Sequence, residues 1–229
     1  SITTGSTPGE HGVVGYKIRV GTQTLNILRW TTESGPAHLD VEPEQFQPII
    51  PFNGTNPTVV SPAAFVDGGF TSAHLRFSKY AGYWMSSSIA TEIGDALRNE
   101  DPFVYAYYDG LDKIGHIKGF GPHYEAELRH IDHIVESVVN ELPSGTALVV
   151  TADHGMVQIG DNLTEISPTV LEMTTGISGE ARFVWLHSKE KETESIHDKA
   201  TEAHGEIAWV FTREDILGQG WFGREVSDV

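Results

Sequence analysis

The chain has 229 residues, of which 39% are hydrophobic and 10% aromatic, enough for one large core or for one core with a small subdomain. Fifteen Lys and Arg against 32 Asp and Glu give a formal net charge of −17, which disfavours binding to a nucleic-acid polymer or to an anionic membrane surface. The absence of Cys excludes disulfide scaffolds, thiol catalysis and cysteine metal sites, so the eleven His must supply any soft metal ligand. No apolar run approaches the roughly 18 to 20 residues of a membrane span. The composition leaves cellular location and oligomeric state open.

The first 57 residues are rich in Gly, Thr, Pro and Ser, which predicts loops with short strands near residues 16–20 and 25–30. We expect this part to be a loop-rich segment on the substrate side of a single domain, whose βα core spans residues 58–229. Asn26 lies where such a segment could face substrate. Trp30 is better explained by core packing.

The middle of the chain has the clearest periodic patterns. Residues 58–65 indicate a strand interrupted by Pro62, and residues 88–99 have helical spacing. Residues 102–108 (PFVYAYY) indicate a buried strand, and an apolar stripe from Tyr124 to Leu142 predicts a helix of about five turns. Residues 146–152 (TALVVTA) are typical of a strand buried on both faces of a parallel sheet. Strand, helix and strand together predict a βαβ unit.

The C-terminal part repeats the alternation. Strands are expected at residues 182–187 and 207–212, with a charged helix at residues 189–204 between them. These elements predict the α/β class, with a mostly parallel central sheet flanked by helices.

Acidic and imidazole side chains follow two of the predicted strands. Asp112 and His116 come after residues 102–108, and Asp153 and His154 come directly after residues 146–152. The carboxyl ends of parallel strands meet at one edge of a sheet, so both pairs should face one cleft. The spacing from Asp112 to His116 places both side chains on one side of a turn. Asp153 and His154 need a bend after the strand, which Gly155 permits.

Carboxylate oxygen and imidazole nitrogen together suit Zn²⁺, and also Mn²⁺ or Fe²⁺. The alternative for each pair is structural: an Asp that caps a helix and a His bonded to a backbone carbonyl. That alternative is favoured for either pair alone and is disfavoured for both pairs at one sheet edge. His130 and His133 lie off the apolar stripe of their predicted helix, so a solvated face is expected for them.

The string Thr151-Ala152-Asp153-His154-Gly155-Met156, preceded by Asp112 and Gly115-His116, resembles the alkaline phosphatase superfamily, and most closely its nucleotide pyrophosphatase/phosphodiesterase branch. The opening Ser1-Ile2-Thr3-Thr4-Gly5, followed by Pro8 and His11-Gly12, is similar to the stretch after the catalytic threonine in that family. The resemblance implies an alkaline phosphatase-like fold and a two-zinc phosphohydrolase.

In this resemblance Asp112 and His116 hold one zinc ion, and Asp153 and His154 hold the other. It further implies a phosphothreonine intermediate whose Thr, like a further Asp ligand, lies upstream of Ser1. A family His ligand near the C-terminus has no match after Phe222. The sequence is therefore expected to be cut at both ends, and this chain alone to be inactive. Tyr16 stands where better-known members place an Asn, and its phenol could bind a phosphoryl oxygen.

The expected substrate is a small phosphodiester or a nucleotide, cleaved at a phosphodiester or pyrophosphate bond. Two alternatives remain open. One is a phosphomonoesterase or phosphonate hydrolase that uses the same metals. The other, of a different class, is a metal-binding module without catalytic activity.

Overall fold

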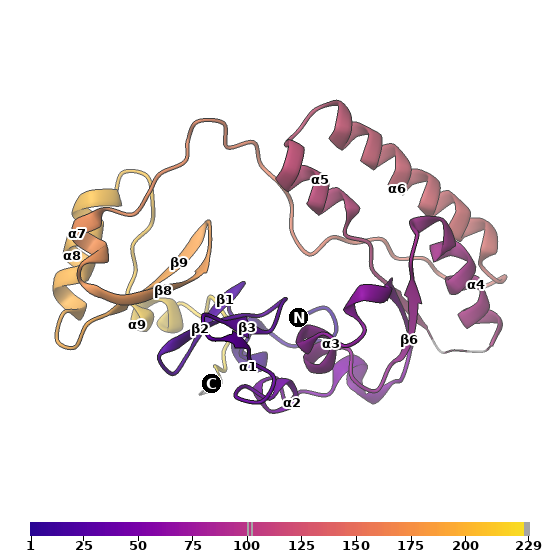
Figure 1. The fold of residues 1–229 in the computed structure, drawn as a ribbon, viewed down its shortest axis with the longest axis horizontal. Coiled ribbons are helices and arrows are strands. Elements are labelled where there is room, and N and C mark those ends of the chain that lie inside the picture. Colours follow the sequence, from indigo (N-terminus) through magenta and orange to yellow (C-terminus); the bar gives the residue numbers. More distant parts are fainter. Residues whose placement is uncertain (100, 102, 227–229) are drawn as a thin grey trace.

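The computed structural model describes residues 1–99, 101 and 103–226. It contains a three-stranded parallel sheet and a six-stranded antiparallel sheet, each accompanied by helices. In Figure 1 helices α4, α5 and α6 lie on one side of the molecule, and strands β8 and β9 with helices α7 to α9 lie on the other. Within the described part of the chain, no helix is both long enough and apolar enough to cross a bilayer.

The parallel sheet has the order β6-β5-β7, with β5 (Thr58–Pro62) between β6 (Lys79–Tyr83) and β7 (Val104–Ala106). Val59 and Val60 at its centre are fully buried, as β-branched residues of a central strand commonly are. Pro62 ends β5, because proline cannot donate a ladder hydrogen bond. The chain passes from β5 to β6 through η2 (Ala63–Phe65) and α3 (Gly69–His74), and from β6 to β7 through η3 (Ser86–Ser88) and α4 (Ile89–Arg98).

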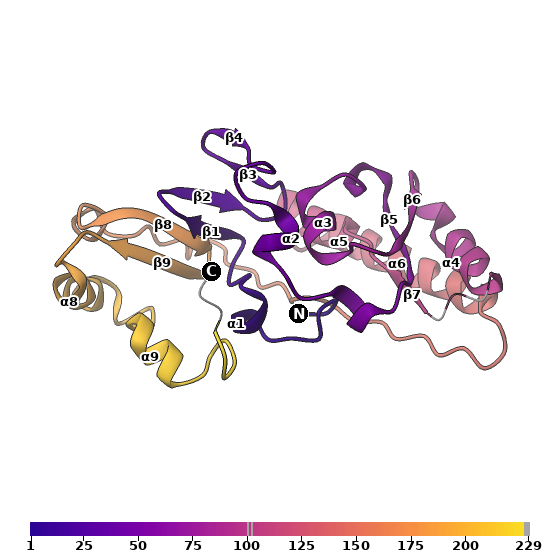
Figure 2. The same ribbon diagram turned by 90° about the horizontal axis from the view of Figure 1, so that it is seen from below.

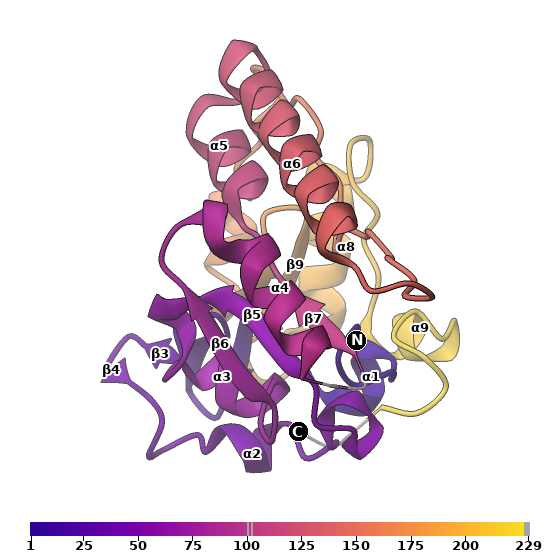
Figure 3. The ribbon, with the colours of Figure 1, turned by 90° about the vertical axis from the view of Figure 1, so that its right-hand side faces the viewer.

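Helices α4 and α6 (Pro122–Glu141) pack together beside this sheet, as Figure 3 shows, and α5 (Gly110–Lys118) packs along α6. Ile89 and Ile93 of α4 and Val138 of α6 form one buried cluster with Val60 and Tyr83 of the sheet. The apolar stripe that predicted α4 is therefore its buried face, whereas the stripe of α6 is buried at Val138 and Leu128 is 45% exposed. Helix α6 ends before Pro143, as expected from the inability of proline to continue a helix.

The antiparallel sheet joins segments far apart in the sequence. Its order is β4-β3-β2-β1-β8-β9, and β1 meets β8 where Lys17 pairs with Gly179. Figure 2 shows β1, β2, β8 and β9 side by side. The strand bounds are β1 (Lys17–Val20), β2 (Gln23–Asn26), β3 (Thr31–Thr32), β4 (Gly35–Pro36), β8 (Thr174–Glu180) and β9 (Phe183–Ser188).

A second core surrounds Trp30, which is fully buried and donates a 2.7 Å hydrogen bond from Nε1 to the carbonyl of Val41. Phe46 packs edge-on against the Trp30 ring at 5.7 Å, and Leu25 belongs to the same cluster. The prediction that Trp30 is a core residue is confirmed. The remaining elements are α1 (Pro8–His11), α2 (Pro43–Phe46), η1 (Pro51–Gly54), α7 (Pro168–Leu171), α8 (Thr193–His204) and α9 (Arg213–Gly218).

The α/β class is confirmed, but a mostly parallel central sheet is not, because six strands lie in the antiparallel sheet and three in the parallel one. Strand β9 covers most of the strand predicted at residues 182–187, but it pairs antiparallel with β8. The strand predicted at residues 102–108 is formed as the shorter β7, and its first residue, Pro102, lies outside the described residues.

Two predicted strands are wrong. Residues 146–152 and 207–212, all of them described, form neither strand nor helix. Both segments are rich in apolar residues, which suggested that they are buried. Val149 is nevertheless 82% exposed and Trp209 is 87% exposed. A strand exists only where a neighbour accepts its hydrogen bonds, and neither segment has a partner strand in the described structure. The βαβ unit expected between residues 102 and 152 is therefore not completed.

Candidate functional site

Asp112 and His116 lie on helix α5, one turn apart. Residues four apart on a helix are neighbours on one face, and Oδ1 of Asp112 is 3.4 Å from Nε2 of His116. The sequence spacing had predicted this juxtaposition, and the structure contains it.

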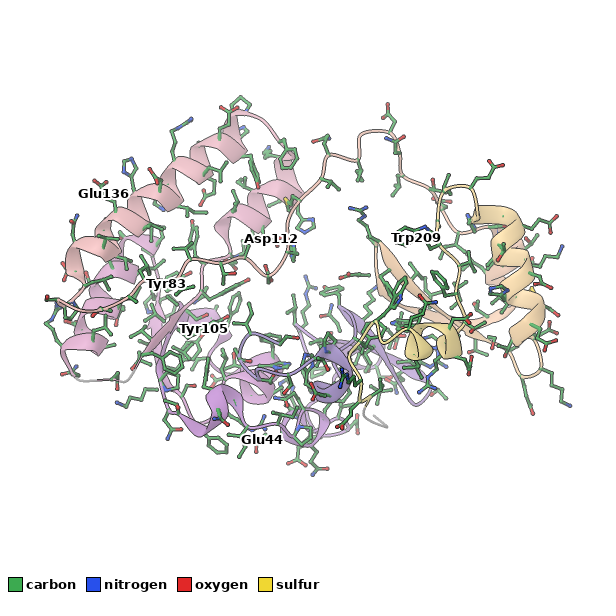
Figure 4. The ribbon with its side chains drawn as sticks, turned by 180° about the vertical axis from the view of Figure 1, so that it is seen from behind. Glu44, Tyr83, Tyr105, Asp112, Glu136 and Trp209 are labelled. Carbon is green, nitrogen blue, oxygen red and sulfur yellow. The ribbon has the colours of Figure 1, made fainter. Side chains whose placement is uncertain are left out.

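Asp153 and His154 lie in an irregular segment that passes α5, and they meet Asp112 there. Nε2 of His154 is 3.8 Å from Oδ1 of Asp112 and 3.9 Å from Oδ1 of Asp153, and the backbone N–H of His154 donates to Asp153 Oδ1 at 3.0 Å. Figure 4 labels Asp112, which lies on α5 beside this segment. All four predicted side chains thus form one cluster, although the strand expected to position the second pair is absent.

The cluster contains an electrostatic conflict. Oδ1 of Asp112 is buried and has no hydrogen-bond partner in the described structure, although it lies near two imidazoles. Nδ1 of His154 is 3.0 Å from the carbonyl of Gly155, so Nδ1 is the donor and Nε2 faces the carboxylate. A neutral imidazole would direct a lone pair at this carboxylate oxygen, which is unfavourable unless a proton or a metal cation lies between them.

The surroundings favour positive charge at His154. The hydrogen bond to the Gly155 carbonyl raises its pKa most; burial opposes this, and the carboxylates of Asp153, Asp112 and Glu180 raise it further. Glu180 is the last residue of β8, so the end of the antiparallel sheet contributes to the field at this cluster.

The donor set suits a divalent cation. In a tetrahedral zinc site with bonds of about 2.1 Å, ligand atoms are separated by about 3.4 Å, close to the Asp112–His116 distance. In the part of the chain that the structure describes, no group of three or more His, Asp and Glu side chains is closed around one point. The ligand atoms are therefore gathered pairwise and do not form a finished coordination sphere.

Tyr107, directly after β7, has a phenol that the carboxylates of the site affect, and the sequence did not single it out. Burial raises the pKa of its phenol to about 12, and the carboxylates of Asp109, Asp153 and Asp112 contribute to the rise. The phenol is therefore neutral at physiological pH and can donate a hydrogen bond to an anion. Its place at the carboxyl end of a parallel strand was the available signal.

Tyr16 and Asn26, the predicted substrate-binding residues, are bonded to each other. Nδ2 of Asn26 donates to the Tyr16 hydroxyl oxygen at 2.6 Å. Tyr16 directly precedes β1, and Asn26 ends β2, so both belong to the antiparallel sheet. The sheet approaches the acidic cluster through β8 and Glu180, and the structure gives no direct contact between Tyr16 and Asp112.

His130 differs from the expectation of a solvated face, whereas His133 matches it. Nε2 of His130 is 2.8 Å from Oγ of Ser86, while the His133 side chain is 76% exposed and lies 3.6 Å from Glu136. A shallow groove there is lined by Ser86, Ser87, Ala90, His130, His133, Ile134 and Ser137. The partner of His130 is distant in sequence, which is why periodicity could not reveal it.

The fold and the cluster define the class of protein: an α/β protein with an acid–imidazole site at the end of a parallel strand. Over residues 1–229 the sequence matches the family described as Type I phosphodiesterase / nucleotide pyrophosphatase. The chain belongs to this family, which confirms the resemblance found in its motifs. At the level of the family the protein is a phosphodiester hydrolase. No curated protein and no solved structure matches it.

Proposed function

We propose that this protein is a metal-dependent hydrolase of small phosphodiesters or nucleotides, which cleaves phosphodiester or pyrophosphate bonds. The single observation that supports this most directly is the buried, unpartnered Oδ1 of Asp112 between the imidazoles of His116 and His154. In a family of phosphodiesterases, a cation at this point would resolve the electrostatic conflict and attract an anionic substrate to a chain of charge −17.

Four side chains would hold two zinc ions, or Mn²⁺ or Fe²⁺ in their place: Asp112 and His116 hold one, and Asp153 and His154 hold the other. When bound, the two cations polarise the phosphoryl oxygen and neutralise charge on the attacking and leaving oxygens. The hydrogen bond from His154 to the Gly155 carbonyl fixes the tautomer in which Nε2 is free to act as a ligand.

The proposed reaction has two displacements. The hydroxyl oxygen of a threonine upstream of Ser1 bonds to phosphorus, the bond from phosphorus to the leaving oxygen breaks, and the leaving group departs as an alcohol or phosphate. Water then cleaves the phosphothreonine ester and regenerates the hydroxyl.

Tyr16 is proposed to bind a phosphoryl oxygen. Asn26 donates to the Tyr16 oxygen, so the hydroxyl proton remains available for the substrate.

The test compares this chain with a longer form that includes the preceding residues. Each is incubated with Zn²⁺ and p-nitrophenyl thymidine monophosphate, with and without EDTA, and nitrophenol release is measured. We expect chelator-sensitive release by the longer form and none by residues 1–229 alone. Preferential cleavage of p-nitrophenyl phosphate would favour a phosphomonoesterase, and no release from either substrate would contradict the proposal.

Two variants of the longer form make the test specific. His154→Gln should lower turnover by at least about 100-fold, because it removes one of the proposed ligands. His133→Gln is the matched control, since this exposed histidine of α6 should be dispensable.

A further inference from the structure

Met156 is the least exposed residue of the segment that contains Asp153 and His154. Residues 143–165, all of them described, form no helix or strand, and every residue among them except Met156 is exposed. A long irregular segment of this kind has few contacts that could fix the position of its side chains. The partial burial of Met156 therefore marks a place where the segment is docked.

Met156 docks on helix α5 at Gly115. A Cβ atom at Gly115 would lie 2.1 Å from Sδ of Met156 and 2.5 Å from its Cε, so the thioether occupies the space that any side chain would need. Gly119 follows one turn later, and a Cβ there would lie 3.7 Å from Oε1 of Gln158. Two glycines four residues apart thus face two alternate residues of the docked segment.

Gly115 is explained by this contact and not by its backbone. Its φ lies outside the left-handed region, so an L-residue could adopt the same conformation. Glycine inside a helix is destabilising relative to alanine, because its backbone loses more freedom on folding. A glycine at this position is expected only where a neighbour needs the space.

The contact lies between the two halves of the site. Gly115 directly precedes His116 and is three residues after Asp112, and Met156 is two residues after His154. We propose that the Met156–Gly115 contact sets the spacing between the Asp112–His116 pair and the Asp153–His154 pair, which makes Met156 and Gly115 positioning residues. This inference rests on the proposed metal-dependent function. A flexible, polarisable thioether can fill such an irregular gap closely.

The first experiment examines the docking in the metal-free protein. Dilute hydrogen peroxide converts methionine to its sulfoxide, and mass spectrometry of peptides gives the rate at each position. Met85, 72% exposed, is the internal reference. Met156 should oxidise at least about threefold more slowly than Met85 in the native chain, and at a similar rate in Gly115→Ala. Equal rates in the native chain would overturn the docking.

The second experiment measures Zn²⁺ affinity by titration calorimetry for the native chain, four test variants and one control variant. Gly115→Ala and Met156→Ala should each weaken binding at least about tenfold, because the two pairs lose their register, and Met156→Leu should stay within about threefold. The double variant Gly115→Ala/Met156→Ala should bind more tightly than Gly115→Ala, since the thioether no longer collides with the new methyl group. Native-like affinity in both single variants would overturn the proposal, as would a double variant no better than Gly115→Ala.

Val157→Ala is the matched control, because Val157 is 59% exposed in the same segment. It should leave affinity unchanged, and a tenfold loss there would mean that any truncation of the segment weakens binding. Circular dichroism establishes that each variant is folded, and if Gly115→Ala fails to fold, Met156→Ala and Met156→Leu still decide. If the native chain binds no Zn²⁺, the proposed function fails, whereas peroxide oxidation still reports on the docking.

Discussion

His11 and His74 should make the stability of this protein strongly dependent on pH. Both side chains are 3% exposed, and their rings meet edge-on at 6.1 Å. Nδ1 of His11 accepts the N–H of Val13, and Nε2 of His74 has no hydrogen-bond partner in the described structure. Burial lowers the pKa of His11 to about 4 and that of His74 to about 3, and His11 adds to the effect on His74.

The sign follows from proton binding. In the unfolded chain both imidazoles titrate near their ordinary pKa of 6.5, while in the folded protein they stay neutral to much lower pH. The unfolded state therefore binds more protons below pH 6.5, and the free energy of unfolding falls as the pH falls. Each histidine contributes a slope of about 1.4 kcal/mol per pH unit. Between pH 8 and pH 5 this amounts to about 2 kcal/mol each, or about 4 kcal/mol together, a large part of a typical domain stability.

The assay is urea unfolding at pH 8 and at pH 5, followed by circular dichroism. His74→Leu replaces the unpartnered imidazole with an apolar side chain beside Phe70, whose ring centroid lies 4.6 Å from that of His74. The variant should lose about 2 kcal/mol less than the native chain between the two pH values. His133→Gln, on the exposed face of α6, should keep the full pH dependence. The same loss in His74→Leu as in the native chain would refute the reasoning.

Three further predictions concern stability. Gly69→Ala should lower the free energy of unfolding by about 1 to 3 kcal/mol, because the new Cβ would lie 2.2 Å from the buried Trp30 ring. Gly218→Ala, whose Cβ would lie in open space, is the control, and equal melting temperatures for the two variants would contradict the prediction. Trp30→Phe should cost about 1 to 3 kcal/mol through the loss of the Nε1 hydrogen bond, and unchanged urea unfolding would count against that bond. Asp101→Asn should lower the free energy of unfolding by about 1 to 3 kcal/mol at pH 7, because the buried carboxylate accepts hydrogen bonds from Thr58 and Lys79, which lower its pKa. The difference in stability between the variant and the native chain should shrink below pH 4, and a difference that is the same at both pH values would contradict this prediction.

Local patterns predicted the elements that bury one face against a neighbour. The apolar spacing of Ile89 and Ile93 located α4, and the stripe through Val138 located α6, because a helix with such a stripe must bury it. The four-residue spacing of Asp112 and His116 likewise predicted that both side chains lie on one side of a turn, and helix α5 places them there.

Long-range pairing could not be predicted in this way. An apolar run such as residues 146–152 has the composition of a buried strand, but its composition does not predict which sheet edge, if any, is free to pair with it. The pairing of Lys17 with Gly179 depends on two segments more than 160 residues apart, which is why the antiparallel sheet was not expected. The contact of Met156 with Gly115 has the same origin, and its one local signal was a glycine inside a helix.

The central claim is that Asp112 lies between His116 and His154 as a ligand for a divalent cation. The most direct test is calorimetric titration of Zn²⁺ into the metal-free native chain, into Asp112→Asn and into Asp132→Asn, an exposed residue of α6. The account predicts that the native chain and Asp132→Asn bind Zn²⁺ alike, and that Asp112→Asn binds it at least about tenfold more weakly. Equal affinity in all three proteins, or no binding by the native chain, would contradict it.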